Sequence, residues 1–156
     1  MAKIDRKYLA HYINVGEGEA VYERLGKDLE EFHAELSAQV ETKKNILGET
    51  SIVISGYEKT GAVEPYYAES GSGLFNKLQA IIDGDLVLDD LKTDVVEVKL
   101  WEAQEGSVFP ACKEEVYIEI NSYGGDTTGY QIPFTLHYTG VKQKGTFDVS
   151  TKVFTA

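Results

Sequence analysis

The stretch EFHAELSAQVET, residues 31–42, alternates between apolar and polar side chains. Its apolar residues stand at every second position, at Phe32, Ala34, Leu36, Ala38 and Val40. A β-strand places alternate residues on one face, whereas a helix would scatter these five around its axis. The alternation therefore predicts a long strand with one apolar and one wet face, although several of its residues favour helices. An amphipathic helix that begins at Asp28 is the alternative.

The two-residue period continues on both sides of this strand, and one segment breaks it. Further strands are predicted at residues 8–15, 20–25, 51–57, 96–101, 115–120, 131–138 and 146–154. Ser72 is a suitable helix N-cap, and Gly84 is expected to end the helix. The apolar face of this helix comprises Leu74, Phe75, Leu78, Ile81 and Ile82. The pattern predicts a mainly β fold, an antiparallel sandwich or barrel with one flanking α-helix.

Two polar, glycine-bearing segments interrupt the predicted strands. Residues 43–51 (KKNILGETS) are expected to form an extended loop or hairpin tip, with Gly48 as its hinge. Residues 61–71 are expected to form a second loop. No repeat or linker divides the chain, and its 156 residues suit one domain over residues 1–156.

The composition excludes some classes of protein. The chain has 15 Lys and Arg against 26 Asp and Glu, a formal net charge of −11. Tight, unspecific binding of nucleic acid is therefore not expected, because it needs cations that replace counterions on phosphates. Cys112 is the single cysteine, so an internal disulfide is impossible. The sequence shows neither a secretory signal nor an apolar run of membrane-spanning length, so no membrane is expected as a partner.

The sequence contains fragments of known motifs, but none is complete. The glycines at 16 and 18 lack the third glycine and the helix of a dinucleotide site, and the GSG at 71–73 is expected to be a capping loop. Residues 83–90 are rich in Asp, but the fifth and sixth positions of a calcium loop hold Val87 and Leu88. Cys112 and the three histidines lie far apart and outside any catalytic motif. We therefore expect no enzyme activity, no cofactor and no bound metal.

The amino-acid sequence resembles a known protein family over about residues 20–85. The segments YERLGKDLEEFHAEL and VETKKNILGETSIVISGYEKTGAVEPYYAESGSGLFNKLQAIID are similar to the major tail tube protein of tailed bacteriophages, in particular long-tailed phages. The order of elements agrees with this resemblance, since a hairpin precedes one helix and further alternating strands follow. The resemblance implies a fold shared with the tubes of contractile tails and of type VI secretion.

The resemblance also implies an assembly. Such subunits form hexameric rings that stack into a tube, and their sheets join into an inner β-barrel through which DNA passes without tight binding. The apolar face of the long strand is expected to pack within the subunit. The polar face, namely Glu35, Ser37, Gln39 and Glu41, is expected to line the channel. The loop residues Lys43, Lys44, Asn45 and Glu49 are expected to contact the next ring.

The resemblance further implies partners and a location. The expected partners are other copies of the chain and the phage tail initiator, terminator and tape measure proteins. The expected location is the virion tail, after assembly in the host cytoplasm. The alternative is a small acidic β-sandwich that binds a ligand or carbohydrate, with Trp101 and tyrosines as a stacking platform. A tube subunit would form rings or polymers, whereas a binding module would be small in solution.

Overall fold

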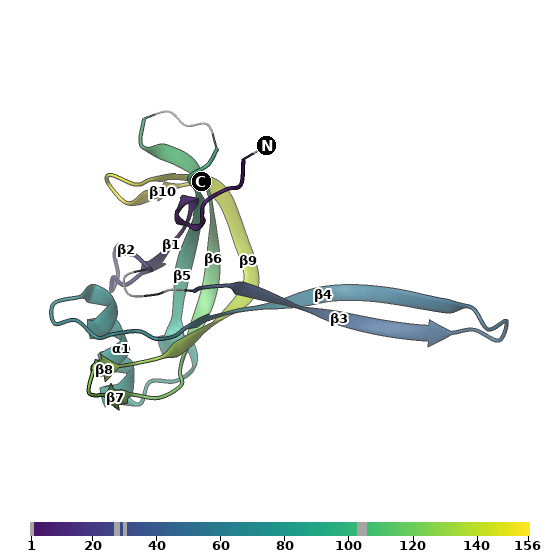
Figure 1. Ribbon diagram of the computed structural model, residues 1–156, viewed down its shortest axis with the longest axis horizontal. Coiled ribbons are helices and arrows are strands. Elements are labelled where there is room, and N and C mark those ends of the chain that lie inside the picture. Colours follow the sequence, from purple (N-terminus) through teal and green to yellow (C-terminus); the bar gives the residue numbers. More distant parts are fainter. Residues whose placement is uncertain (1, 27–28, 30, 103–105) are drawn as a thin grey trace.

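The structure, a computed structural model, describes residues 2–26, 29, 31–102 and 106–156. A body built from a sheet and a helix carries a long two-stranded ribbon that extends far to one side (Figure 1). The strands are β1 Leu9–Asn14, β2 Tyr22–Arg24, β3 Ala34–Lys44, β4 Thr50–Val63, β5 Lys92–Lys99, β6 Val108–Ile120, β7 Gly124–Asp126, β8 Gly129–Gln131, β9 Phe134–Asp148 and β10 Val153–Thr155. The helix α1 spans Gly73–Gly84, and the short 3-10 helices η1 and η2 span Arg6–Tyr8 and Leu88–Leu91.

Antiparallel pairing joins most of these strands into one sheet. Within the described residues, eight strands form a sheet in the order β2-β1-β5-β6-β9-β4-β3, and β10 pairs with β9 beside this path. The short strands β7 and β8 form a separate pair. The predicted mainly β, antiparallel fold with one helix is confirmed. The long strand predicted from residues 31–42 is β3, and Asp28, where the helix alternative began, lies outside the described residues.

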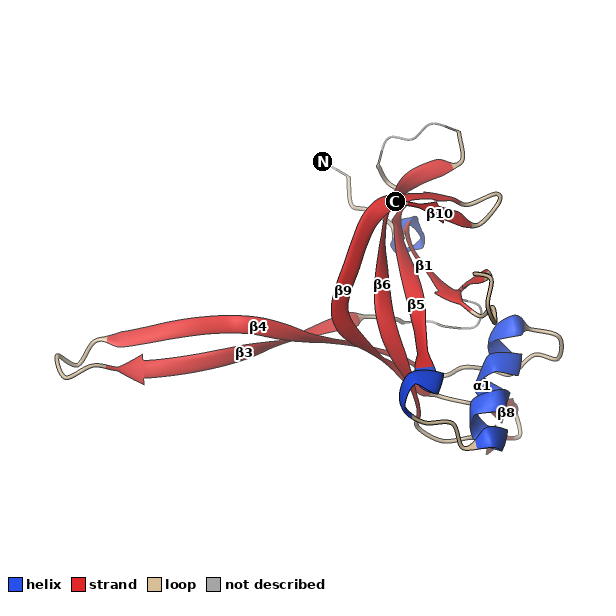
Figure 2. Cartoon of the chain, turned by 180° about the vertical axis from the view of Figure 1, so that it is seen from behind, coloured by secondary structure: helices blue, strands red, loops and turns tan. Residues whose placement is uncertain are grey.

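The sheet is buried on both faces, by different parts of the chain. On one face, Ile13, Val95, Val116, Ile118 and Phe134 pack with the buried residues of α1. On the other face, Tyr12, Val96, Val98 and Phe147 form a second cluster with other residues of the same sheet. β5 contributes to both clusters, because its neighbours Val95 and Val96 point to opposite sides. Figure 2 shows α1 beside the lower half of the sheet, where it covers the first cluster.

The helix α1 begins where the sequence predicts and ends one residue later than expected. The Ser72 hydroxyl accepts a hydrogen bond from the Phe75 amide. Glu23 of β2 adds a second cap, because its carboxylate accepts hydrogen bonds from the Leu74 amide and the Ser72 hydroxyl. Gly84 still belongs to the helix, and Asp85 takes the left-handed conformation that ends it, with a φ of 49°.

Both predicted loops are shorter than expected, because the strands extend into them. Lys43 and Lys44 belong to β3 and Ser51 belongs to β4, so the hairpin turn is confined to residues 45–49. The second segment begins with the last three residues of β4, and only the part after Val63 is irregular. The strands extend into the predicted loop because β3 and β4 pair with each other as far as Lys44 and Thr50.

Candidate assembly surface

The hairpin of β3 and β4 leaves the body as an isolated ribbon. β4 pairs with β9 only over its last four residues, from Thr60 to Val63. The ten residues of β4 from Thr50 to Lys59 have β3 as their only strand neighbour within the described residues. At ~3.3 Å per residue the ribbon is roughly 30 Å long. A lone two-stranded ribbon is marginally stable in water, and this part of the hairpin has no third strand beside it within the described residues.

The ribbon has one apolar and one polar face. Residues opposite each other in an antiparallel pair point to the same side. Leu36 pairs with Lys59, Ala38 with Tyr57, Val40 with Ile54, and Thr42 with Ile52, which defines the first face. The second face pairs Glu35 with Thr60, Ser37 with Glu58, Gln39 with Gly56, and Glu41 with Val53. We call these the apolar face and the polar face of the ribbon.

A β-bulge keeps the apolar face continuous along the ribbon. The register shifts between Gln39, which pairs with Gly56, and Val40, which pairs with Ile54, so Ser55 lies opposite no residue of β3, although its hydroxyl donates to the Gln39 carbonyl at 3.5 Å. An extra residue of this kind shifts the inward and outward alternation of β4 by one position relative to the alternation of β3. Without this offset, Val53 rather than Ile54 and Ile52 would share the side of Tyr57. The bulge therefore aligns the apolar residues of the outer half with those of the inner half.

The apolar face is exposed in the isolated subunit, which corrects one expectation. Phe32, just before β3, is buried, but Leu36 and Val40 are 61% and 56% exposed. On β4, Ile52, Ile54 and Tyr57 are also exposed. The expectation that the apolar side of the long strand packs inward within the subunit is therefore wrong beyond Phe32. The physical reason is that the ribbon carries these residues away from the body, as Figure 2 shows.

The tip of the ribbon combines a rigid turn with exposed apolar side chains. The Asn45 side-chain oxygen accepts hydrogen bonds from the amides of Leu47 and Glu49, at 2.9 and 3.0 Å. Gly48 has a φ of 81°, a conformation that favours glycine. The side chains of Ile46 and Leu47 are among the most exposed large apolar groups of the described residues. The four residues expected to contact the next ring, Lys43, Lys44, Asn45 and Glu49, lie at this tip and just before it.

At its root, the ribbon is tied to the N-terminal part of the chain. The Phe32 ring meets His11 edge-to-face at 4.8 Å. It also lies over Gly61, where an added Cβ would be 2.7 Å from the ring. The Arg6 guanidinium donates to the Phe32 and Leu9 carbonyls, and Arg24 donates to the Lys7 carbonyl. These contacts fix the position from which β3 starts.

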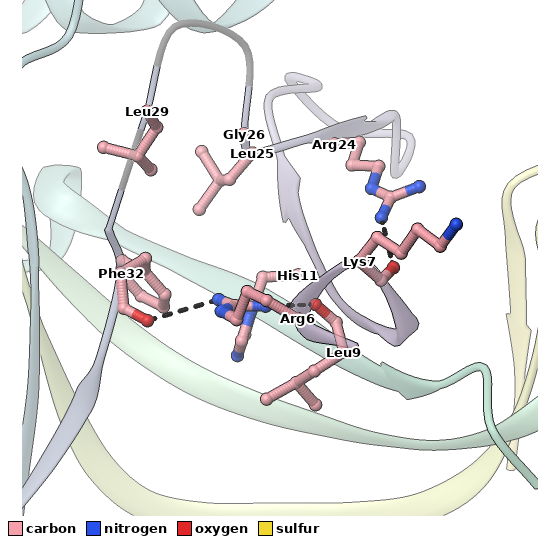
Figure 3. Close-up of a pocket in the computed structure, with 9 residues that line it drawn as sticks. All are labelled: Arg6, Lys7, Leu9, His11, Arg24, Leu25, Gly26, Leu29 and Phe32. Atoms are coloured by element: carbon pink, nitrogen blue, oxygen red, sulfur yellow. Dashed lines mark hydrogen bonds between the residues drawn. The ribbon is translucent and has the colours of Figure 1, made fainter. Parts of the chain in front are cut away.

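A cavity of about 510 Å³ lies beside this root (Figure 3). Its lining includes the cations Arg6, Lys7 and Arg24 and the apolar residues Leu9, Leu25, Leu29 and Phe32. Both guanidinium groups already donate to backbone carbonyls. The cavity wall is thus part of the tie between the N-terminal segment and the ribbon.

The residues that the sequence singled out for chemistry do not form a metal site in the described part of the chain. Among the described residues, no group of three or more His, Cys, Asp or Glu side chains is arranged to hold a metal ion. His33 is exposed and pairs with Glu31 at 2.6 Å. Burial raises the pKa of the Cys112 thiol, and the nearby Glu114 carboxylate adds to this effect. No helix in the described part of the chain has the length and apolarity to cross a membrane.

Trp101 and three of the tyrosines considered for a stacking platform lie in different parts of the structure. Trp101 follows β5 in a turn and is partly exposed. Tyr12 and Tyr22 are buried and pack against Phe147, with ring centroids 4.6 and 5.6 Å away. Tyr57 lies on the apolar face of the ribbon. These four residues do not form one surface that could stack on a sugar.

The arrangement of sheet, helix and ribbon defines a class of fold. The structure of the SPP1 phage tail tube resembles it with a TM-score of 0.63 and 14% identity, over 91% of this chain and 78% of that chain. A chain of the sheath/tube terminator of the extracellular contractile injection system PVC resembles it with a TM-score of 0.57 and 11% identity, over 92% of this chain and 98% of that chain. A chain of the PVC sheath-tube complex gives a TM-score of 0.53 and 10% identity, over 90% and 91% of the two chains.

These similarities show the fold. The protein has the fold of phage tail tube proteins, as the sequence resemblance implied. Neither a protein-family model nor a curated protein matches the sequence. The alternation in residues 31–42 pointed to the two-faced strand, but the exposure of its apolar side depends on the direction of the ribbon. That direction is a tertiary property without a local sequence signal.

Proposed function

We propose that the protein is the subunit of a phage tail tube and polymerises as stacked hexameric rings. The observation that carries this proposal is the exposed apolar face of the ribbon, in a fold shared with tail tube proteins. Large contiguous apolar surfaces on soluble proteins mark sites of interaction. Fully burying a large apolar side chain contributes about 1.5–3 kcal/mol. Docking the ribbon on a second copy would therefore stabilise both the ribbon and the assembly.

The polar face of the ribbon is proposed to line the channel. Glu35, Ser37, Gln39 and Glu41 alternate with the apolar residues and point to the opposite side. When a second copy covers the apolar face, this polar face is the one left to water. Its carboxylates would repel DNA phosphates, mainly within a screening length of about 8 Å at physiological salt. The lumen would then let DNA pass without holding it.

The remaining contacts in the proposed tube follow from the same arrangement. The tip residues Lys43, Lys44, Asn45 and Glu49 would contact the next ring. The ends of the tube would meet the initiator and terminator of the tail, and a tape measure protein would occupy the lumen during assembly. The protein would act in the virion tail as a structural component rather than an enzyme, after assembly in the host cytoplasm. The chain would serve as one domain over residues 1–156.

Light scattering and electron microscopy of the purified protein test this proposal. We expect rings or tubes whose formation rises with protein concentration. The variant Ile52→Ser/Ile54→Ser should remain folded and lose assembly, because it removes apolar contacts of the ribbon. The control Val53→Ser changes the intervening residue on the opposite face and should assemble. A protein that stays monomeric at every concentration, or equal assembly of both variants, would contradict the proposal.

A further inference from the structure

A charged residue interrupts the apolar face where the ribbon meets the body. Lys59 is the cross-strand partner of Leu36 and directly precedes Thr60, where pairing between β4 and β9 begins. Its side chain is only 15% exposed. Lysine is seldom buried unless it is paired with an acidic group. A partner for the Lys59 ammonium group is therefore expected nearby.

Lys59 reaches across β9 to β6. Its Nζ donates to both carboxylate oxygens of Glu114, each at 2.9 Å, and the Glu114 side chain is buried. On the way it lies over the ring of Tyr138 in β9, at 4.6 Å from the ring centroid. It is also 3.9 Å from Glu97 in β5, which in turn lies 3.3 Å from His11 Nε2 in β1. One side chain thus links the ribbon to the inner strands of the body.

The sheet is irregular at the point that this link spans. The register between β6 and β9 shifts between Glu114, which pairs with Lys142, and Val116, which pairs with Tyr138. The backbone of β9 therefore makes a local detour, which includes Gly140 at a φ of 91°. Backbone pairing alone leaves the root of the ribbon with four β4–β9 residue pairs next to an irregular strand. The Lys59–Glu114 pair adds a tie on the far side of this irregularity.

The expected energy of the Lys59–Glu114 ion pair indicates a role other than a large contribution to the stability of the fold. A buried ion pair loses about as much on desolvation as it gains in attraction, and apolar replacements of both partners are often neutral or stabilising. Its geometry is nevertheless restrictive, because rotation of the ribbon about its root would move Nζ away from a buried carboxylate. That carboxylate would then lack its principal cation, which is costly. The pair therefore opposes changes in the direction of the ribbon.

We propose that Lys59 and Glu114 are positioning residues that hold the ribbon in the direction in which it docks on a second copy. This inference rests on the proposed self-assembly, but the direction of the ribbon can be measured in the monomer alone. If loss of the tie leaves about a tenth of the molecules in the competent direction, the protein concentration needed for assembly rises about tenfold.

Spin labels test the direction of the ribbon. With Cys112 replaced by Ala, labels on Glu49→Cys at the tip and Ala80→Cys on an exposed position of α1 report the distance from ribbon to body. We expect a narrow distance distribution in this background and a broad one when Lys59→Met/Glu114→Leu is added. The matched control is Lys92→Met/Glu115→Leu, which removes a more exposed pair at 3.4 Å between β5 and β6. It should leave the distribution narrow.

The same variants, without labels, are then compared in assembly. Lys59→Met/Glu114→Leu should need about tenfold more protein to assemble, and Lys59→Arg, which retains the charge, should restore assembly. If the double variant fails to fold, Glu114→Gln replaces it, with the same expected broadening. A narrow distribution in the folded variants overturns the positioning role, whether or not the protein assembles. Failure of the parent protein to assemble contradicts the proposed function and leaves the distance measurement in the monomer decisive for the tie.

Discussion

Tyr22 and Tyr138 are phenols that burial affects in the same direction but that have different partners. Burial raises the pKa of Tyr22, and the hydrogen bond to Asp94 and the charge of Asp94 raise it further. Burial also raises the pKa of Tyr138, with smaller contributions from the charges of Glu114 and Glu97. The Tyr138 hydroxyl has no hydrogen-bond partner among the described residues. Replacing each tyrosine should therefore change the free energy of unfolding by different amounts at neutral pH. At alkaline pH, both phenols should contribute to the loss of stability in the same direction.

The first prediction concerns alkaline pH. Because both folded-state pKa values lie above the ordinary tyrosine value of about 10, the folded state keeps protons that the unfolded chain loses. The stabilisation is complete below pH of about 10 and declines as pH rises through the folded-state pKa values. We expect the free energy of unfolding in urea to fall above that pH, together with the appearance of tyrosinate absorbance.

The matched variants are Tyr22→Phe and Tyr138→Phe. At neutral pH, Tyr22→Phe should cost about 1 kcal/mol through the lost hydrogen bond, whereas Tyr138→Phe should be nearly neutral because it removes an unpaired hydroxyl. The double variant should show a flatter decline at alkaline pH than the parent protein. An equal decline in both proteins would show that these phenols are not the cause.

At the scale of elements, the start of α1 depends on a residue distant in sequence. Glu23 of β2 accepts hydrogen bonds from Ser72 and from the Leu74 amide. Loss of a capping side chain typically costs about 1 kcal/mol, and a carboxylate also favours the positive end of the helix dipole. We predict that Glu23→Ala lowers the free energy of unfolding by about 1–2 kcal/mol. Glu23→Gln should lose less, which denaturant unfolding at neutral pH can measure.

The bulge in the ribbon allows a second prediction at this scale. Inserting one alanine after Gln39 would pair it with Ser55 and restore regular alternation. Val40, Ile54 and Ile52 would then turn to the polar face. We predict that this insertion leaves the body folded and abolishes assembly, as judged by circular dichroism and electron microscopy.

Deletion of Ser55 is the control for this insertion. It also removes the bulge, but it retains the pairs of Gln39 with Gly56 and of Val40 with Ile54, so both faces keep their residues. This variant should assemble, although its ribbon is straighter. If the insertion variant assembles, or if both variants fail to assemble, assembly does not depend on the alignment of the apolar face, and the prediction is wrong.

The sequence predicted the positions of the strands and the helix better than the contacts that their side chains make. The two-residue period located β3, and Ser72 located the start of α1, because both signals are local. The capping role of Glu23 and the pairing of Lys59 with Glu114 depend on contacts between residues about 50 apart in sequence. Local pattern carries no information on such contacts. The polar face of β3 was assigned correctly to the side opposite Leu36 and Val40, and its position in a channel stays a prediction.

At the scale of the whole molecule, the proposed channel makes a prediction about charge. Glu35 and Glu41 lie on the polar face, and ring symmetry would repeat them around the lumen. Glu35→Lys/Glu41→Lys would present cations to the phosphates, and each contact would release counterions and favour binding. We expect assembly to persist, because both side chains are exposed. Genome release from virions with these substitutions should be slower, and high salt should relieve the effect.

The control for this charge reversal replaces the same two glutamates with neutral glutamines of similar size. Glu35→Gln/Glu41→Gln should release the genome at nearly the normal rate, because it removes repulsion without adding attraction. Unchanged release by the lysine variant at low and high salt would contradict an electrostatic role for this face. Loss of assembly in both variants would instead place the polar face in a contact between subunits.

The central claim is that a second copy covers the apolar face of the ribbon while the polar face borders a water-filled channel. A cryo-EM reconstruction of the assembled protein tests it most directly. We predict rings in which Val40, Ile52 and Ile54 are buried against a neighbouring subunit, and in which Glu35 and Glu41 face the lumen. A reconstruction in which the ribbon is free in solvent, or in which the apolar face borders the channel, would contradict this account.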